Sequence, residues 1–512
     1  MEHNKTDKYS LIQRMKKWVI PHLNTFILCL FLLLVTTVIK ISGPIIIQIA
    51  VDDYIIPKNL QGLITILGGY ILVLALGYFA NYIEIVKLET VGQVIVAEIK
   101  NAAFKHILTL NMSYFDKSTT GKLVSRIEND SNAMKVLFTS VITNVIGSII
   151  LLLGMLAVMA FKYNSTLALS LLITVPVMLI GGYAFDKVMS PRLVNIRKYV
   201  ADVSSYVTEI IHGISIIQIF GQEKRVLKEL KVRSDFKYKS ESVVAVMFNS
   251  FFNLLFFMEA LGTVIIISLG AQMAVKGELT VGSLILFINF IRSFFMPIIH
   301  LSGQFNEFQK GIAGAIRVFD LLDTVNNIPE PEVPKEIADK TKGIDIEFRN
   351  VWFRYDDNSD WVLKDISFFC SRGQHWAIVG PTGSGKTTII SLLLKFYLPQ
   401  KGEILLNGVN INDISKIELR NTLGLVLQEN ILFPGTIYEN LTLNQNFYLE
   451  SEINTLMKQL GIDSVISRLH DGYNTEIKEN ASNLSSGERQ LISFGRALLK
   501  NPSILIFDEA TS

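Results

Sequence analysis

The stretch that decides the fold of this chain is His375–Phe396, which reads HWAIVGPTGSGKTTIISLLLKF. An apolar run comes first, a glycine-rich loop follows, and an amphipathic segment closes the stretch. This order predicts a β-strand, a loop and an α-helix. The loop matches the pattern G-x-x-x-x-G-K-[ST], with Gly380, Gly385, Lys386 and Thr387 at its defined positions. The sequence therefore predicts a phosphate-binding loop within an α/β domain.

The chemistry of a nucleoside triphosphate explains the residue types in this loop. Glycines let backbone N–H groups wrap around phosphate oxygens, and the start of the following helix adds a favourable partial charge. Lys386 can reach the β- and γ-phosphates, and the Thr387 hydroxyl can ligate Mg²⁺. The alternative is a structural glycine turn, which the flanking strand and helix patterns disfavour. The residues predicted to bind ATP here are Gly380, Thr382, Gly383, Ser384, Gly385, Lys386, Thr387 and Thr388.

A pair of carboxylates lies in the last stretch of the sequence, SILIFDEATS, which covers Ser503–Ser512. Its apolar residues predict a buried parallel strand, and the sites of α/β domains open at the carboxyl ends of such strands. Asp508 is placed to complete the Mg²⁺ shell, and Glu509 is placed to polarise the attacking water as the catalytic base. A surface carboxylate pair would give the same letters. The phosphate-binding loop upstream favours the catalytic interpretation.

The first 310 residues have the composition of a membrane domain. Apolar residues make up 50% of the chain and charged residues only 18%. Six runs are long enough to cross a bilayer, which needs about 20 residues, and six in series disfavour buried core helices as the explanation. The net charge of +2 gives no indication of nucleic-acid binding. The predicted spans are Thr25–Val51, Leu60–Ile83, Val136–Phe161, Tyr163–Phe185, Ser242–Val275 and Leu279–Leu301.

The distribution of lysine and arginine predicts how the chain is oriented in the membrane. These residues are concentrated in the N-terminal segment and in 186–241, whereas the connections DDYIIPKN, KYN and KGE are short and poor in them. Both termini and the long connections 84–135 and 186–241 are therefore predicted to be cytoplasmic, in a plasma membrane such as a bacterial inner membrane. The predicted domains are a leader at 1–24, a six-helix membrane domain at 25–310, a linker at 311–343 and an α/β nucleotide-binding domain at 344–512.

The segment NLSSGERQLISFGRALLKNP, at 483–502, resembles the signature of ABC transporters, which usually reads L-S-G-G-Q before a helix. Ser486 replaces a glycine here, and Glu488 replaces the glutamine. A serine and backbone amides at the start of a helix can bind an anion. The resemblance implies that Ser485, Gly487 and Glu488 act in trans, facing the γ-phosphate that the opposite subunit holds. A nucleotide would therefore join two such domains.

This resemblance covers nearly the whole chain. Tyr355 corresponds to the aromatic residue that stacks on adenine, and Gln428 to the glutamine that contacts Mg²⁺ and senses the γ-phosphate. Stretches near 113–121 and 211–220 look like the coupling helices of two cytoplasmic loops. These matches imply an exporter-type half-transporter, with six membrane helices fused to one P-loop ATPase domain.

The resemblance also implies partners and an activity. Because each nucleotide site needs residues from two chains, the partner is a second ABC half-transporter in either a homodimer or a heterodimer. The implied activity is ATP- and Mg²⁺-dependent export of hydrophobic or amphipathic, drug- or lipid-like compounds across the bilayer by alternating access. A lipid flippase and an ATP-gated, channel-like protein are the alternatives.

Glu259 and Arg292 stand out among the ionisable residues within the predicted spans. Such residues are costly in a bilayer and are usually functional. Both are predicted at about mid-depth of adjacent helices. They could line a substrate cavity and select charged compounds, or they could pair with each other and hold two helices in register.

The position of Glu509 in the sequence gives one further expectation. ABC transporters continue beyond this glutamate with residues that contact the dimer partner and the γ-phosphate. The resemblance therefore predicts that the 512-residue chain is a fragment or truncated product that binds nucleotide weakly and hydrolyses it poorly.

Overall fold

The chain forms two compact units in the computed structural model, which describes residues 8–163, 174–326, 328, 330–338, 343–428, 430–445 and 448–508. The helical unit comprises Met1–Lys105 and Val124–Asp323. The α/β unit comprises Thr324–Ser512 together with His106–Leu123. A short segment from the first long connection therefore belongs to the α/β unit, although about 200 residues separate the two along the sequence.

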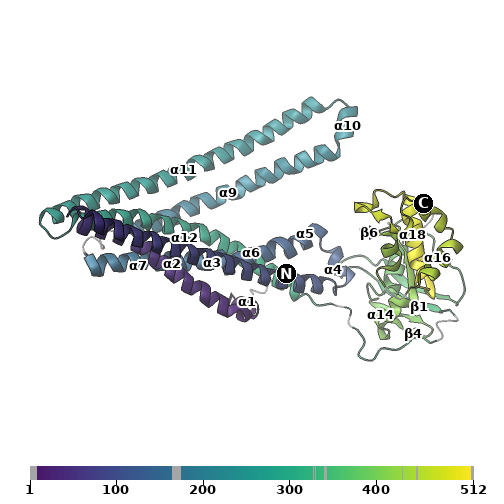
Figure 1. Cartoon of the computed structure of the whole chain (residues 1–512). Coiled ribbons are helices and arrows are strands. Elements are labelled where there is room, and N and C mark those ends of the chain that lie inside the picture. Colours follow the sequence, from purple (N-terminus) through teal and green to yellow (C-terminus); the bar gives the residue numbers. More distant parts are fainter. Residues whose placement is uncertain are drawn as a thin grey trace. The chain divides into compact units, whose positions relative to one another are not determined.

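Long helices build the helical unit (Figure 1). Among the described residues, four stretches are long and apolar enough to span a membrane, namely Gln13–Ile55, Leu60–Ile107, Thr120–Phe161 and Glu223–Val275, and a shorter apolar stretch covers Val281–Phe295 at the start of α12. The predicted span Tyr163–Phe185 falls partly outside the described residues. The main helices are α1 (Lys8–Val19), α2 (Leu23–Ile49), α3 (Leu60–Ile107), α6 (Ser131–Val136), α7 (Ile142–Val158), α9 (Thr174–His212), α10 (Ile214–Ile219), α11 (Glu223–Val275) and α12 (Val281–Leu322). Helix α5 (Thr120–Ser125) begins in the segment assigned to the α/β unit.

Several helices are much longer than a bilayer requires. Helix α3 has 48 residues and α11 has 53, whereas about 20 residues cross the hydrocarbon region. Helices α9 and α11 pack against each other and form a hairpin with α10 at its tip (Figure 1). Parts of the two long connections, 84–107, 186–212 and 223–241, therefore continue the helices of the neighbouring predicted spans.

Helix α12 lies at the centre of the helical unit. Phe287, Phe290 and Phe294 recur at helical spacing on one face, and all three are buried. They pack in one core with Met155 and Met159, which come from the end of α7 and the turn after it. Helix α12 also packs against α2 and α11, so one continuous apolar face holds several spans together.

The segments at both ends of the predicted membrane domain pack into the helical unit. The leader contains helix α1, whose Leu11 is only 2% exposed and packs in one core with Val318 and Phe319 of α12. Arg14 in α1 pairs with Asp323 at 2.6 Å. Helix α12 continues to Leu322, so the first third of the predicted linker is helical and belongs to the helical unit.

The described part of the α/β unit contains three small sheets. The first has the order β2-β1-β3-β4 and is antiparallel, the second pairs β5 with β8 in parallel, and the third pairs β6 with β7. The strands are β1 (Ile346–Phe353), β2 (Leu363–Cys370), β3 (Lys401–Leu406), β4 (Val409–Asn410), β5 (Leu423–Val426), β6 (Gly435–Thr436), β7 (Glu476–Ile477) and β8 (Ile504–Phe507). The helices are α4 (Met112–Asp116), α13 (Lys386–Leu393), α14 (Lys416–Thr422), α15 (Ile437–Thr442), α16 (Glu450–Gln459), α17 (Asp463–Ile466) and α18 (Ser486–Leu499).

The strand predicted just before the phosphate-binding loop is not formed, and this prediction was wrong. Residues 375–380 form neither helix nor strand and belong to none of the three sheets, and Val379 is 88% exposed. A strand is stabilised by ladder hydrogen bonds to its neighbours, and this run has no such neighbour among the described strands. Strand β8 is parallel, as predicted, but its residues are only partly buried.

Candidate nucleotide-binding site

The phosphate-binding loop has a backbone that requires glycine at two positions. Gly383 and Gly385 have φ values of +83° and +92°, in the left-handed region that residues with a Cβ rarely adopt. A Cβ on Gly385 would also lie 2.6 Å from Cδ2 of Leu363. Gly385 is the N-cap of α13, so the loop leads directly into a helix N-terminus. This arrangement of turn and helix start is suited to a phosphate group.

Lys386 lies over this loop. Its Nζ donates to the carbonyl oxygens of Gly380 and Pro381 at 2.8 and 3.1 Å. The ammonium group is thus held beside the backbone that would surround a phosphate, while Thr382 and Ser384 remain exposed to solvent. The oxygens of a bound triphosphate could replace these two carbonyl oxygens as acceptors for the Lys386 ammonium group, without a large movement of the Lys386 side chain.

Thr387 and Asp508 meet across the two halves of the site. The Thr387 hydroxyl donates to Oδ2 of Asp508 at 3.5 Å. Asp508 follows β8, and its N–H donates to Val426 of β5 at 3.0 Å, so the parallel ladder positions it. A hydroxyl and a carboxylate fit Mg²⁺, which prefers oxygen ligands and usually completes its shell with phosphate and water. When bound, Mg²⁺ would neutralise charge on the phosphates.

Two further residues of the predicted site are Gln428 and Glu509. Gln428 lies two residues after β5, at the same end of the parallel pair as Asp508, and is exposed. Glu509 lies outside the described residues, so the predicted catalytic base stays a prediction.

Tyr355 lies beside the helix that follows the loop. Its hydroxyl is 3.0 Å from Oγ1 of Thr388 in α13, and the side chain is partly exposed. The ring packs edge-to-face against Phe353 and Tyr397, with centroid distances of 4.9 and 5.1 Å. The predicted adenine-stacking residue is therefore next to the phosphate-binding helix.

The start of α18 forms a capping box that the sequence reasoning missed. Ser485 Oγ accepts from the N–H of Glu488 at 3.3 Å, and Glu488 Oε2 accepts from the N–H and hydroxyl of Ser485 at 2.7 and 2.9 Å. These hydrogen bonds lower the pKa of Glu488. The motif S-x-x-E was the signal for it. In the single chain, the N–H and the hydroxyl of Ser485, which are predicted to donate to a γ-phosphate, therefore donate to the Glu488 carboxylate instead.

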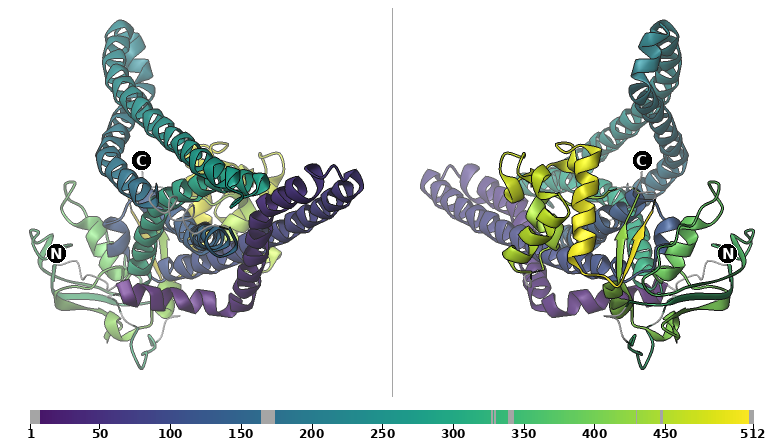
Figure 2. Two further views of the ribbon diagram at one scale, coloured as in Figure 1. Left: turned by 90° about the vertical axis from the view of Figure 1, so that its left-hand side faces the viewer. Right: turned by 90° about the vertical axis from the view of Figure 1, so that its right-hand side faces the viewer.

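The sequence patterns also did not predict the contact between Arg496 and Asn440. Arg496 Nε donates to the backbone oxygen of Asn440 at 2.8 Å, and Nη2 donates to Asn440 Oδ1 at 3.0 Å. Nη1 donates to the carbonyl of Ile431 at 3.0 Å. Burial lowers the pKa of Arg496. Helix α18 also packs on α15 and β5, and it is the yellow helix beside the strands in the right-hand view of Figure 2. Helix α18, which carries the signature segment, thus makes hydrogen bonds to the segment that follows Gln428.

Helices occur at both predicted coupling segments. Helix α4 lies in the first one, where the Tyr397 hydroxyl donates to Asp116 within the α/β unit. Helix α10 lies in the second, at the tip of the hairpin of α9 and α11.

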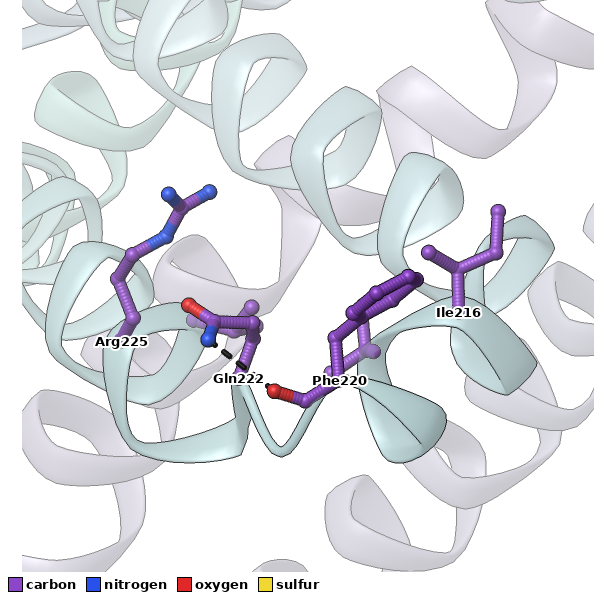
Figure 3. Close-up of a pocket in the computed structure, with 6 residues that line it drawn as sticks. Ile216, Phe220, Gln222 and Arg225 are labelled. Atoms are coloured by element: carbon purple, nitrogen blue, oxygen red, sulfur yellow. Dashed lines mark hydrogen bonds between the residues drawn. The ribbon is translucent and has the colours of Figure 1, made fainter.

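The hairpin tip carries a shallow pocket of about 370 Å³, shown in Figure 3. Ile216, Phe220 and Arg225 are among its lining residues, and Gln222 Nε2 donates to the carbonyl of Phe220 at 3.2 Å. Ile219 and Phe220 are 78% and 70% exposed. The tip is therefore an apolar surface left open in the single chain.

Glu259 and Arg292 lie close together in the helical unit. Oε1 of Glu259 is 3.8 Å from Nε of Arg292, and the Arg292 side chain is 68% exposed. Helices α11 and α12, which carry them, pack against each other. This geometry supports the pairing interpretation, and the cavity-lining role stays a prediction.

A phosphate-binding loop, a facing carboxylate strand and long apolar helices define a class of protein, the membrane-bound P-loop nucleotide-binding proteins. The model of the ABC transporter transmembrane region matches residues 26–298, and the ABC transporter model matches residues 363–512. This chain belongs to the ABC transporter family. It is an ATP-hydrolysing transporter in which a helical membrane domain precedes the ATPase domain, so the predicted fold class and family are confirmed.

Relatives with descriptive names cover most of the chain. It is 34% identical to the probable multidrug resistance ABC transporter ATP-binding/permease protein YheH of Bacillus subtilis, over 89% of this chain and 67% of that protein. It is 31% identical to the ATP-dependent lipid A-core flippase of Syntrophus aciditrophicus, over 99% of this chain and 83% of that protein. The fold resembles a bacterial Atm1-family ABC exporter solved with ATP bound, with a TM-score of 0.76 and 24% identity, over 95% of this chain and 86% of that one.

Proposed function

We propose that this chain is an exporter-type half-transporter that uses ATP to move hydrophobic or amphipathic compounds across a plasma membrane. The observation that carries the proposal is the 3.5 Å approach of Thr387 and Asp508 beside the phosphate-binding loop, in a chain with several membrane-length helices. The names of the two relatives, a multidrug resistance protein and a lipid flippase, support this substrate class. Both termini and the two long connections are cytoplasmic.

Each group of residues in the proposed site binds a different part of the nucleotide or acts on the attacking water. Tyr355 stacks on the adenine, Lys386 and the loop amides hold the phosphates, and Glu509 activates the attacking water. Mg²⁺ is held by Thr387, Gln428 and Asp508. The residues that contact the phosphates are Gly380, Thr382, Gly383, Ser384, Gly385 and Thr388 from this chain, and Ser485, Gly487 and Glu488 from its partner.

The functional form is a dimer with a second ABC half-transporter, either identical or different. The exposed apolar tip at Ile219 and Phe220 supports this proposal, because exposed apolar patches on a protein surface commonly mark interaction sites. In the dimer, this tip contacts an ATPase domain and transmits its movement to the membrane helices. Glu259 and Arg292 lie next to the transport path and limit which charged compounds enter it.

Transport in lipid vesicles tests the proposal. ATP and Mg²⁺ should drive accumulation of a fluorescent amphiphile in inverted vesicles that contain the protein, alone or with a candidate partner. Lys386→Ala should abolish accumulation, whereas Lys458→Ala, on the exposed face of α16, should leave it unchanged. Equal movement of the amphiphile with wild type and Lys386→Ala would contradict an ATP-driven pump and would favour the channel-like alternative.

A further inference from the structure

The first coupling segment contacts the residues around Tyr355. Helix α4 and the nucleotide-binding elements form one compact unit. The Tyr397 hydroxyl donates a hydrogen bond to the carboxylate of Asp116, the last residue of α4. The next residue, Lys117, lies 2.6 Å from Oδ1 of Asp356, which directly follows Tyr355. Lys117 therefore reaches the residue next to Tyr355, and Asp116 reaches Tyr397, which follows α13.

Tyr397 joins the coupling segment to the ring of Tyr355. The two rings pack edge-to-face, with centroids 5.1 Å apart and an interplanar angle of 88°. Phe353 contacts both rings and is only 1% exposed, so it forms a fixed support beneath them. Tyr355 in turn reaches Thr388 of α13 through its hydroxyl. An unbroken series of contacts thus runs from the phosphate-binding helix to Asp116.

The two contacts of the coupling segment lead to different places. Both side chains of the Lys117–Asp356 pair are more than half exposed, and exposed ion pairs contribute little. Asp116 is also exposed, but its partner Tyr397 packs directly against the ring of Tyr355. The Tyr397–Asp116 bond is therefore the contact that continues to the nucleotide site.

We propose that Tyr397 is a positioning residue through which the first coupling segment senses a purine base stacked on Tyr355. This inference rests on the proposed function, in which Tyr355 binds the adenine of ATP. A base that reorients the Tyr355 ring changes the surface against which Tyr397 packs, and the Tyr397 hydroxyl passes this change to Asp116. Because coupling free energies are reciprocal, breaking the bond to Asp116 also alters the affinity for ATP.

The test uses Tyr397→Phe, which keeps the aromatic ring against Phe353 and Tyr355 and removes only the hydroxyl. Hydrogen–deuterium exchange is measured on the full chain in lipid, with Mg²⁺ and saturating ATP. In the wild type, ATP should slow exchange both at 380–393 and at 112–118. In Tyr397→Phe, protection at 380–393 should persist, whereas protection at 112–118 should fall by about half or more. ATP affinity should change by about fivefold.

Two controls isolate the role of the base and of the hydroxyl. Tyr473→Phe removes a buried hydroxyl that has no hydrogen-bond partner within the described part of the chain, and it should behave as the wild type. Inorganic tripolyphosphate carries phosphates without a base. It should protect 380–393 and leave 112–118 unprotected.

The possible failures are distinguishable. Equal ATP-dependent protection at 112–118 in wild type and Tyr397→Phe would overturn the inference. So would protection of 112–118 by tripolyphosphate, or loss of protection at both segments in Tyr397→Phe, because Tyr397 would then support the fold or the phosphate site. If ATP protected neither segment of the wild type, the proposed function itself would fail.

Discussion

The hydroxyl of Thr387, at the start of α13, lies 3.5 Å from the carboxylate of Asp508, at the end of β8. The two residues are 121 positions apart in the sequence and come from different elements. The hydroxyl is exposed, so a metal ion and a phosphate could reach it. This approach brings the two halves of a magnesium nucleotide site together.

Removing either oxygen should weaken Mg²⁺-dependent nucleotide binding. Thr387→Val keeps the shape of the side chain but removes a ligand, and we expect the affinity for ATP with Mg²⁺ to fall about tenfold or more. Binding without Mg²⁺ should change little. Titration calorimetry with and without Mg²⁺ measures both quantities. The control is Thr455→Val in α16, outside the site, and equal losses in the two variants would contradict the assignment.

Glu509→Gln should lower ATP turnover while leaving ATP binding intact, because the amide cannot accept a proton from the attacking water. General-base catalysis contributes about 10²–10⁴-fold, so we expect a loss within that range. Steady-state phosphate release measures turnover. Glu450→Gln at the start of α16 is the matched control. Unchanged turnover in Glu509→Gln would show that another group is the base.

The start of α18 should lose stability in acid. Hydrogen bonds from Ser485 lower the pKa of Glu488 below its ordinary value. A group whose pKa is lowered by folding contributes stability above its unfolded pKa, about 4.3, and this stability is lost as the pH falls through the folded pKa. The protection factors of amides 485–489, which correct for the intrinsic pH dependence of exchange, should therefore fall below about pH 4. Glu488→Gln should show a flatter pH dependence, and an identical dependence in both proteins would exclude this explanation.

Glu488 should also oppose nucleotide binding in trans, since its negative charge lies where a γ-phosphate is proposed to bind. Glu488→Gln keeps the size of the side chain and removes that charge. We expect ATP-induced dimerisation to strengthen about tenfold, which corresponds to ~1.4 kcal/mol. Analytical ultracentrifugation with ATP and without it measures this change. Weaker dimerisation in Glu488→Gln would indicate that the carboxylate assists the partner's site.

A tight approach at one end of the helical unit should make Gly282 intolerant of a side chain. A Cβ on Gly282 would lie 2.6 Å from both the backbone oxygen of Gln48 and Oδ2 of Asp52. Asp52 also accepts hydrogen bonds from the Gly282 N–H at 2.8 Å and the Thr280 hydroxyl at 2.6 Å. We expect Gly282→Ala to lower the free energy of unfolding by about 1–3 kcal/mol.

Gly69→Ala is the matched control for this last prediction. A Cβ on Gly69 would meet no atom within 4 Å, and alanine is a better helix former by about 1 kcal/mol. The midpoint temperature of thermal unfolding in detergent should therefore be lowered in Gly282→Ala and unchanged or raised in Gly69→Ala. Similar shifts in both variants would mean that the approach to Asp52 is not the cause.

Local sequence patterns were sufficient for much of the fold. The phosphate-binding loop, the membrane-length helices and the parallel strand β8 follow from short-range features, because glycine torsions, helix length and apolar runs are properties of neighbouring residues. The run 375–380 shows where such patterns fail. Its apolar residues predict a strand, but a strand forms only where another strand offers it hydrogen bonds.

The sequence by itself determined the class of protein, the phosphate loop and the apolar spans, because these depend on adjacent residues. Only the tertiary structure decided which distant side chains meet. It places Tyr397 against Asp116 and Arg496 against Asn440. Spacing along the chain does not encode these two pairs, since each depends on how separately formed elements pack. For Glu259 and Arg292 the sequence left two alternatives open, and the structure brings the two side chains close together. The connection from the nucleotide site to the first coupling segment is therefore visible only in the folded chain.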